Sequence, residues 1–249
     1  MKWILILSLG FLTFLGCTPK KSSTLTIAVA SNSRWVMEEI IESFRSDHET
    51  DCNLVTASSG KLTAQIMEGA PFDVFLSADM DYPNWLFEQG LVDHSPKVYA
   101  RGSLVLWSIT ESLPPLMDSL LSKNVKSIAI ANPRNAPYGR AALQVLNNYE
   151  VQVSSKLVYG ENVSQATQFL ISGAADLVFT SKSIVFSQEF RDLGHWKEID
   201  PKLYDPLEQG AILISEDSED ARIFFDYLFS EKSRVIFKKH GYLTQQRIE

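Results

Sequence analysis

Four short segments rich in serine, asparagine and glycine carry hydrogen-bond donors that could hold a small anion. They occupy residues 30–33, 57–61, 135–139 and 160–165, and a helix-like stretch begins within each of them. The first turn of a helix leaves backbone N–H groups unpaired at the positive end of the helix dipole, so it attracts anions. Serine hydroxyls add donors, and glycine lets a ligand approach the backbone closely. The four turns therefore predict an oxyanion site.

The same residue types have a second explanation, because Ser, Asn and Gly commonly cap helices without binding anything. Asn162 followed by Gln165, for example, matches a capping box. Spacing alone leaves both explanations open, although four such turns in one chain favour a ligand site.

Catalytic and metal-binding patterns are missing from the sequence. The four histidines, which are scattered and lack metal-ligand spacing, are His48, His94, His195 and His240. No nucleophile elbow, P-loop or dinucleotide-binding glycine motif occurs. Ser31 and Ser59 have no evident base, and Asp73 and Asp79 are expected to be turn and cap residues. We therefore predict a binding protein rather than an enzyme, with no catalytic residue, no cofactor and no metal-cation site.

Strand-like and helix-like stretches alternate along the chain. Predicted strands cover residues 25–30, 53–57, 73–77, 104–109, 127–131, 177–180 and 211–214, and predicted helices cover 33–44, 60–67, 81–89, 139–147, 163–172, 221–230 and 232–240. This alternation predicts an α/β fold with mostly parallel sheets. In such sheets ligands bind beyond the carboxyl ends of the strands, which is where the four turns lie.

The N-terminus predicts export and a lipid anchor. Lys2 is followed by an apolar run that ends at Gly16, directly before Cys17. The run is shorter than the about 20 apolar residues that span a bilayer, so it predicts a signal peptide over residues 1–16. The end of the run resembles a bacterial lipobox, which predicts acylation of Cys17 and a polar tether over 17–24. An ordinary signal peptide with an incidental cysteine is the alternative.

The composition limits the partners of the mature chain. The net charge of −7 argues against nucleic acid, because phosphate binding depends on clustered Lys and Arg. With Cys17 acylated, Cys52 is the only remaining thiol, so no intramolecular disulfide is expected. An acidic protein that binds an anion must therefore attract it through the local dipoles of its binding site, which point toward the anion, and not through its overall charge.

Three segments, residues 57–79, 131–142 and 160–166, resemble the periplasmic molybdate-binding proteins of ABC importers, and the similarity runs from Leu25 to Leu243. The resemblance implies a two-lobed type II periplasmic-binding fold, each lobe a mostly parallel sheet flanked by helices. Lobe 1 would comprise residues 25–101 plus 208–249, and lobe 2 residues 102–207. The chain would cross between them near 101–103 and 205–208.

The resemblance also implies the donors. Ser31 and Ser59 would supply hydroxyl and backbone donors from one lobe, and Tyr138 and Val163 backbone N–H groups from the other. Members of the family often add a Tyr hydroxyl from the strand after the fourth helix. An ungapped count from Val163 places Ser181 there, so Ser181 is the candidate fifth donor in this chain.

The implied function is capture of molybdate or tungstate by a monomer that delivers it to the membrane permease of an ABC importer. Sulfate and phosphate stay open as alternatives. Sulfate and molybdate are both fully ionised near neutral pH and suit a pocket of donors alone. A phosphate site that accepts a protonated oxygen needs a carboxylate, and Glu161 is the only one in the four turns.

Replacing Cys17 with Ser tests the anchor. We expect the wild-type protein to partition with membranes and to carry lipid mass on its N-terminus, whereas Cys17→Ser stays unacylated with its signal peptide uncut by the lipoprotein peptidase. Membrane fractionation and mass spectrometry measure both. A wild-type protein recovered wholly in the soluble fraction, without lipid, contradicts the prediction.

Overall fold

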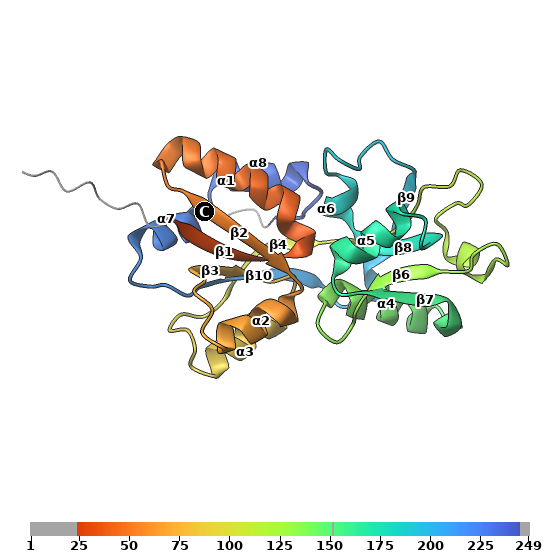
Figure 1. Cartoon of the computed structure of the whole chain (residues 1–249), viewed down its shortest axis with the longest axis horizontal. Coiled ribbons are helices and arrows are strands. Elements are labelled where there is room, and N and C mark those ends of the chain that lie inside the picture. Colours follow the sequence, from red (N-terminus) through yellow and green to blue (C-terminus); the bar gives the residue numbers. More distant parts are fainter. Residues whose placement is uncertain (1–23, 151, 245–249) are drawn as a thin grey trace, which may run out of the picture.

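The computed structural model describes residues 24–150 and 152–244. Within these ranges two five-stranded sheets lie side by side, and helices cover both faces of each sheet (Figure 1). The predicted signal peptide, Cys17 and residues 17–23 of the predicted tether lie outside the described residues. Among the helices of these two ranges, none has the length and apolar character that a membrane span requires.

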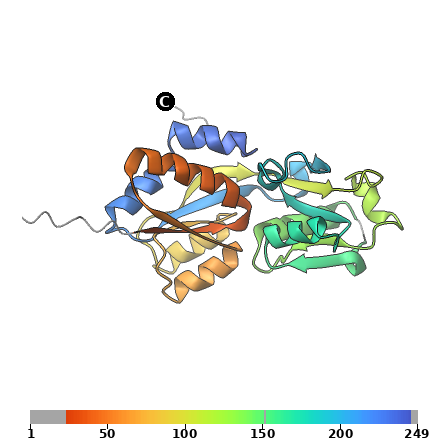
Figure 2. The same ribbon diagram turned by 45° about the horizontal axis from the view of Figure 1, so that its top comes forward.

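The first lobe is built on a sheet with the strand order β2-β1-β3-β10-β4. Its strands are β1 (Leu25–Ala30), β2 (Cys52–Ala57), β3 (Val74–Leu76), β4 (Lys97–Gly102) and β10 (Leu207–Leu213). β1 pairs in parallel with β2 and β3, and β10 runs antiparallel to β3 and β4. One face carries α1 (Arg34–His48), α7 (Glu219–Tyr227) and α8 (Glu231–Lys239), and the other carries α2 (Ser59–Met67) and α3 (Asp81–Glu88) (Figure 2).

The second lobe repeats this plan with the order β7-β6-β8-β5-β9. Its strands are β5 (Leu104–Ser108), β6 (Ile128–Ala131), β7 (Leu157–Gly160), β8 (Leu177–Ser181) and β9 (His195–Glu198). Its helices are α4 (Pro137–Asn148), α5 (Val163–Ile171) and the short α6 (Lys182–Val185). β6 pairs in parallel with β7 and β8, whereas β5 is antiparallel to β8 and β9. In each sheet four strands run one way and only β10 or β5 runs against them, which confirms the predicted two-lobed, mostly parallel α/β architecture.

The chain passes between the sheets twice. It leaves β4 and enters β5 through Ser103, and it returns to β10 through residues 204–206. The Tyr204 hydroxyl accepts a hydrogen bond of 3.1 Å from the Leu104 N–H, so the two crossings are tied together. The lobes are therefore joined by a narrow pair of adjacent segments.

Strand β1 shows how the sequence builds the first lobe. Leu25, Ile27 and Val29 pack with the apolar faces of α1, α7 and α8, whereas Ala28 packs with those of α2 and α3. Successive side chains of a strand point to opposite faces, so one apolar strand serves both layers. All four side chains are buried, and full burial of a Leu, Ile or Val contributes about 1.5–3 kcal/mol.

Three strands of the structure, β4, β7 and β9, were not predicted. Each is an edge strand of its sheet. An edge strand has a neighbour on one side only and commonly carries charged or exposed residues that discourage further pairing. β9, with the sequence His-Trp-Lys-Glu, illustrates the reason, because all four of its residues are exposed or half-buried and no apolar run marks it.

Candidate functional site

A cavity between the two lobes brings the four predicted turns together. It is lined by Ala30, Ser31, Asn32, Ser58, Ser59, Ala78, Ala136, Pro137, Tyr138, Asn162 and Val163. Four of the five predicted donors, Ser31, Ser59, Tyr138 and Val163, are among these residues. None of the lining residues, all of them in the described chain, carries a charge. The cavity is therefore polar through hydroxyl and amide groups alone.

The strands of both lobes position these hydroxyl and amide groups around the cavity. The turns follow β1, β2, β6 and β7, and parallel neighbours end at the same edge of a sheet. Ser59 and Val163 are the first residues of α2 and α5, and Tyr138 is the second residue of α4. Ser31 begins a short 3-10 helix, η1 (Ser31–Ser33). Because N–H groups in a first helical turn lack intrahelical partners, these positions offer backbone donors to the cavity.

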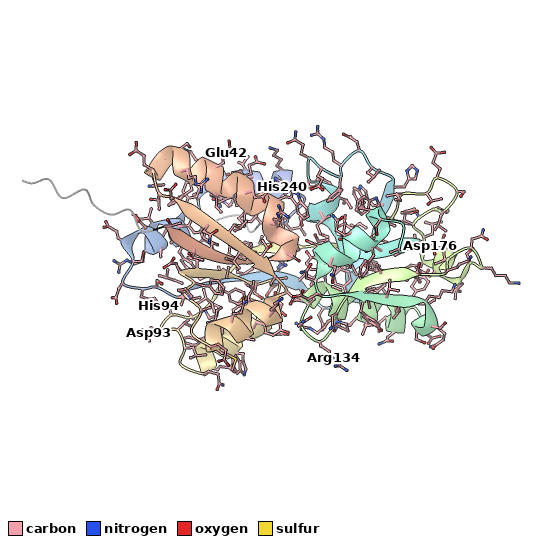
Figure 3. All side chains as sticks on the ribbon, viewed as in Figure 1. Glu42, Asp93, His94, Arg134, Asp176 and His240 are labelled. Atoms are coloured by element: carbon pink, nitrogen blue, oxygen red, sulfur yellow. The ribbon has the colours of Figure 1, made fainter. Side chains whose placement is uncertain are left out.

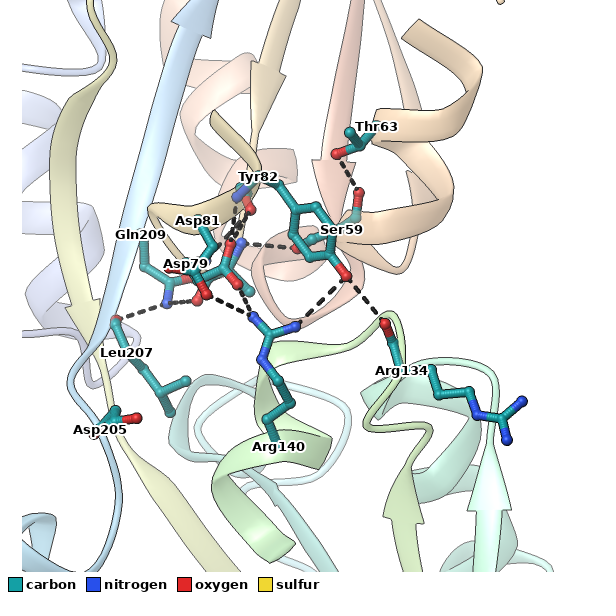
Figure 4. A network of polar contacts seen from close by, with 12 residues as sticks. Ser59, Thr63, Asp79, Asp81, Tyr82, Arg134, Arg140, Asp205, Leu207 and Gln209 are labelled. Atoms are coloured by element: carbon teal, nitrogen blue, oxygen red, sulfur yellow. Dashed lines mark hydrogen bonds and ion pairs between the residues drawn. The ribbon is translucent and has the colours of Figure 1, made fainter. Parts of the chain in front are cut away.

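Ser59 is held in a geometry that leaves its proton available. The side chain is almost fully buried, and its Oγ accepts a hydrogen bond of 3.0 Å from the Ala78 N–H (Figure 4). A serine hydroxyl has one hydrogen and two lone pairs, so the bond from Ala78 leaves the hydrogen free to donate. The Ser59 hydroxyl therefore keeps its hydrogen for one further acceptor.

The phenol of Tyr138 points toward the connection between the two lobes. A Cβ at Gly102 would come within 2.1 Å of the Tyr138 Oη, so the ring points toward the crossing between the lobes. Burial raises the pKa of this phenol well above its ordinary value, and the neighbouring Ser181 hydroxyl offsets part of the rise. The uncharged phenol therefore packs behind the cavity.

Ser181 does not line the cavity. Its hydroxyl is fully buried, lies 2.7 Å from the Ser183 hydroxyl and accepts from the Ile184 N–H at 3.3 Å as the N-cap of α6. The ungapped count aligned Ser181 with a donor of the family. In this structure Ser181 is a helix cap instead, because α6 begins directly after β8.

Asn32, which the sequence did not single out, also lines the cavity. Its side-chain amide donates to Gln209 Oε1 at 2.8 Å and to the Tyr242 hydroxyl at 2.9 Å. Gln209 in turn donates to the Ala78 carbonyl at 3.0 Å. These bonds within the first lobe occupy the side-chain N–H groups of Asn32 and hold the loops after β1 and β3 in register, so the side-chain amide nitrogen is not free to donate to a ligand.

Backbone groups at the cavity rim bond across the two lobes. The Gly60 N–H donates to the Asn135 carbonyl at 2.9 Å. The Ser183 hydroxyl donates to the Asn32 carbonyl at 2.7 Å, and the Ser164 hydroxyl donates to the Ser31 carbonyl at 3.2 Å. The structure therefore has the two lobes closed against each other.

An ion pair also joins the lobes beside the cavity. Arg140 on α4 donates to the carboxylate of Asp79, which follows β3, and its guanidinium lies over the Tyr82 ring (Figure 4). Burial raises the pKa of Asp79, and the charge of Arg140 offsets part of that rise. Asp79 also accepts from the Tyr82 N–H at the start of α3, so the predicted cap residue has a second role between lobes.

The described residues show no catalytic arrangement around the cavity. His240 bonds to Glu39 at 2.9 Å, and His94 lies 3.5 Å from a carboxylate oxygen of Glu216 (both histidines are labelled in Figure 3). Within residues 24–150 and 152–244, no group of three or more His, Cys, Asp or Glu side chains is placed to hold a metal ion. No general base lines the cavity beside Ser31 or Ser59.

Comparison with known proteins agrees with this geometry. The model of the bacterial extracellular solute-binding protein family matches residues 25–243. The chain belongs to this family. The molybdate-binding protein ModA of Azotobacter vinelandii is 35% identical over 249 residues, covering 97% of each chain, and ModA of Rhodobacter capsulatus is 34% identical over 232 residues, covering 91% of each.

The solved structure of the periplasmic molybdate-binding protein of Azotobacter vinelandii superposes with a TM-score of 0.84 at 31% identity. The match covers 89% of this chain and all of that protein. The resemblance indicated by the three sequence segments is thereby confirmed.

Alanine substitution separates ligand donors from helix caps. Removing a hydroxyl that donates to an anion costs about 1.5–3 kcal/mol, so Ser59→Ala and Ser31→Ala should each weaken molybdate binding about ten- to a hundredfold. Val163→Ala should change affinity less, because its backbone N–H survives. Isothermal titration and thermal melting of each variant measure the two effects.

If these serines only support the helix starts, each alanine loses about 1 kcal/mol of folding stability and leaves affinity unchanged. Lower stability with unchanged affinity at both Ser31 and Ser59 contradicts the assignment of the oxyanion site.

Proposed function

We propose that this chain captures molybdate or tungstate between its two lobes and delivers the ion to an ABC importer. One observation carries the proposal: the interlobe cavity is lined by the starts of helices from both lobes and by serine hydroxyls, without a charged side chain. The names of the relatives in Azotobacter and Rhodobacter support the same ligand. Ser31, Ser59, Tyr138 and Val163 are the proposed donors, and Ser181 is left out of the set.

A neutral lining suits a fully ionised oxyanion. Each backbone N–H or hydroxyl donates to an oxygen that accepts only, and charge-assisted hydrogen bonds contribute about 1.5–3 kcal/mol each. A protein with a net charge of −7 gains this attraction locally, from the positive ends of helix dipoles.

Phosphate fits this site poorly. A protonated phosphate oxygen needs an acceptor, and the one carboxylate of the four turns, Glu161, is engaged elsewhere. It forms an ion pair of 2.8 Å with Lys61 of the other lobe and is not part of the cavity lining. Sulfate shares the charge of molybdate and differs in size, so it is the anion that a test must compare.

The proposed setting is outside the cytoplasmic membrane. The predicted signal peptide and Cys17 support export and lipid anchoring, and the proposed partners are the oxyanion, the importer's membrane permease and, through the anchor, the membrane itself. We propose that the protein acts as a monomer without catalytic activity, cofactor or nucleic-acid partner. The moving bodies are residues 25–101 plus 208–249 and residues 102–207.

Titration of the mature domain with molybdate, tungstate, sulfate and phosphate tests the function. The best small ligands bind with about −1.5 kcal/mol per heavy atom, so a five-atom oxyanion should reach a dissociation constant of about a few micromolar. We expect molybdate and tungstate to bind at least this tightly and phosphate to bind far more weakly. Tighter binding of sulfate than of molybdate refutes the assignment.

Gly60→Ala tests whether binding requires closure. An added Cβ would lie 2.6 Å from the Tyr82 Oη and 2.9 Å from the Asn135 Cβ, so it holds the lobes apart. Overpacking of this kind costs about 1–3 kcal/mol, or roughly five- to a hundredfold in affinity. Alanine favours a helix over glycine by about 1 kcal/mol, so the free protein should not lose stability.

Lys61→Ala is the matched control for this variant. It removes only an exposed ion pair with Glu161, and such pairs contribute about 0–1 kcal/mol. Small-angle scattering should show wild-type protein and Lys61→Ala contracting with molybdate and Gly60→Ala failing to do so. Wild-type affinity in Gly60→Ala means that closure does not contribute to binding.

A further inference from the structure

The hydroxyl of Ser58 has no partner in the described part of the chain, although it is buried. Ser58 is 3% exposed, its Oγ makes no hydrogen bond to any described residue, and the residue lines the interlobe cavity. Buried polar groups are nearly always hydrogen-bonded, so one that is not requires an explanation. Ser58 precedes Ser59 in the chain, and the sequence alone did not distinguish the two.

Helix capping does not explain Ser58. It is the N-cap of α2 and has the extended backbone usual at that position, yet its side chain makes no capping bond. The polar N-caps of α5, α7 and α8 behave differently, because Asn162, Ser218 and Ser230 each accept from the backbone N–H three residues on. At α2, the Gly60 N–H donates across the lobes to Asn135 instead. The Ser58 hydroxyl is thus available for something other than its own helix.

We propose that the Ser58 hydroxyl donates a hydrogen bond to the bound oxyanion, as a further side-chain donor beside Ser59. This inference rests on the proposed function and names a residue of the same site. Ser59 and Ser58 have complementary surroundings: the Ser59 Oγ already accepts from Ala78, whereas the Ser58 Oγ has no hydrogen-bond partner among the described residues. Ser58 thus becomes the candidate fifth donor in place of Ser181, whose hydroxyl is already hydrogen-bonded to Ser183.

Ser187 provides a matched control. Its hydroxyl is also fully buried and without a hydrogen-bond partner in the described chain, but Ser187 is not among the residues that line the cavity. Alanine at either position removes an unpaired buried hydroxyl, so neither change should lower the melting temperature of the ligand-free protein through a lost internal bond. Only Ser58→Ala should lower the affinity for molybdate.

The experiment titrates wild type, Ser58→Ala, Ser58→Gly, Ser59→Ala and Ser187→Ala with molybdate, and melts each with and without it. We expect both Ser58 variants to bind about tenfold more weakly or worse, with a smaller molybdate-induced rise in melting temperature. Ser187→Ala should bind like wild type. Glycine is included because it is itself a good N-cap, which keeps α2 intact if alanine does not.

If both Ser58 variants bind molybdate with wild-type affinity, the inference is wrong. A weaker affinity of Ser59→Ala in the same experiment would still support the proposed oxyanion site. A lower melting temperature with unchanged affinity assigns Ser58 a structural role and overturns the inference as well. If wild-type protein binds none of molybdate, tungstate and sulfate, the proposed function itself has failed.

Discussion

Backbone N–H groups at the starts of helices have no partners within their own helices, and the arrangement of this protein follows from that constraint. Four such starts, two from each lobe, meet at one cavity. Neither lobe alone surrounds it, so an anion bound there would contact both lobes and favour their closed arrangement. Because the donors are amide and hydroxyl groups, the cavity selects for a ligand that only accepts hydrogen bonds.

The residues around the cavity maintain this geometry without contributing charge to it. Gln209 ties the loops after β1 and β3 together, and Asp79 pairs with Arg140 across the lobes. Charged groups thus join the lobes beside the ligand, while the lining itself stays neutral. This separation matters because a carboxylate in the lining would repel a fully ionised anion, and a lysine or arginine would attract anions of any shape.

Closure is compatible with a narrow connection between the lobes. The two crossings lie next to each other, joined by the bond from the Leu104 N–H to the Tyr204 hydroxyl, so they can bend together. Hydrogen bonds between specific groups hold the lobes against each other, such as Gly60 to Asn135 and Ser183 to Asn32. Glycine at position 60 permits the close approach, since any side chain there meets the opposite lobe.

Local patterns in the sequence determined the alternation of strands and helices, the α/β class and the four turns that line the cavity. The two-lobed arrangement was implied by the resemblance to a known family. Periodicity, caps and short donor-rich segments are properties of neighbouring residues, so they are visible without coordinates. The edge strand β9 was missed because pairing on one side leaves its residues exposed or half-buried, without an apolar run. The edge strands β4 and β7 were missed although each contains apolar residues.

Only the tertiary structure decided the roles of individual donors. Ser58 and Ser59 are adjacent and chemically identical, yet the Ser58 hydroxyl has no partner in the described chain and the Ser59 hydroxyl accepts from Ala78, 19 residues away. Ser181 was assigned by counting, but its hydroxyl pairs with Ser183. The cross-lobe bond from Ser183 to Asn32 spans 151 residues. Whether a hydroxyl can donate to a ligand depends on which distant groups have already engaged it, and chain folding alone sets those partners.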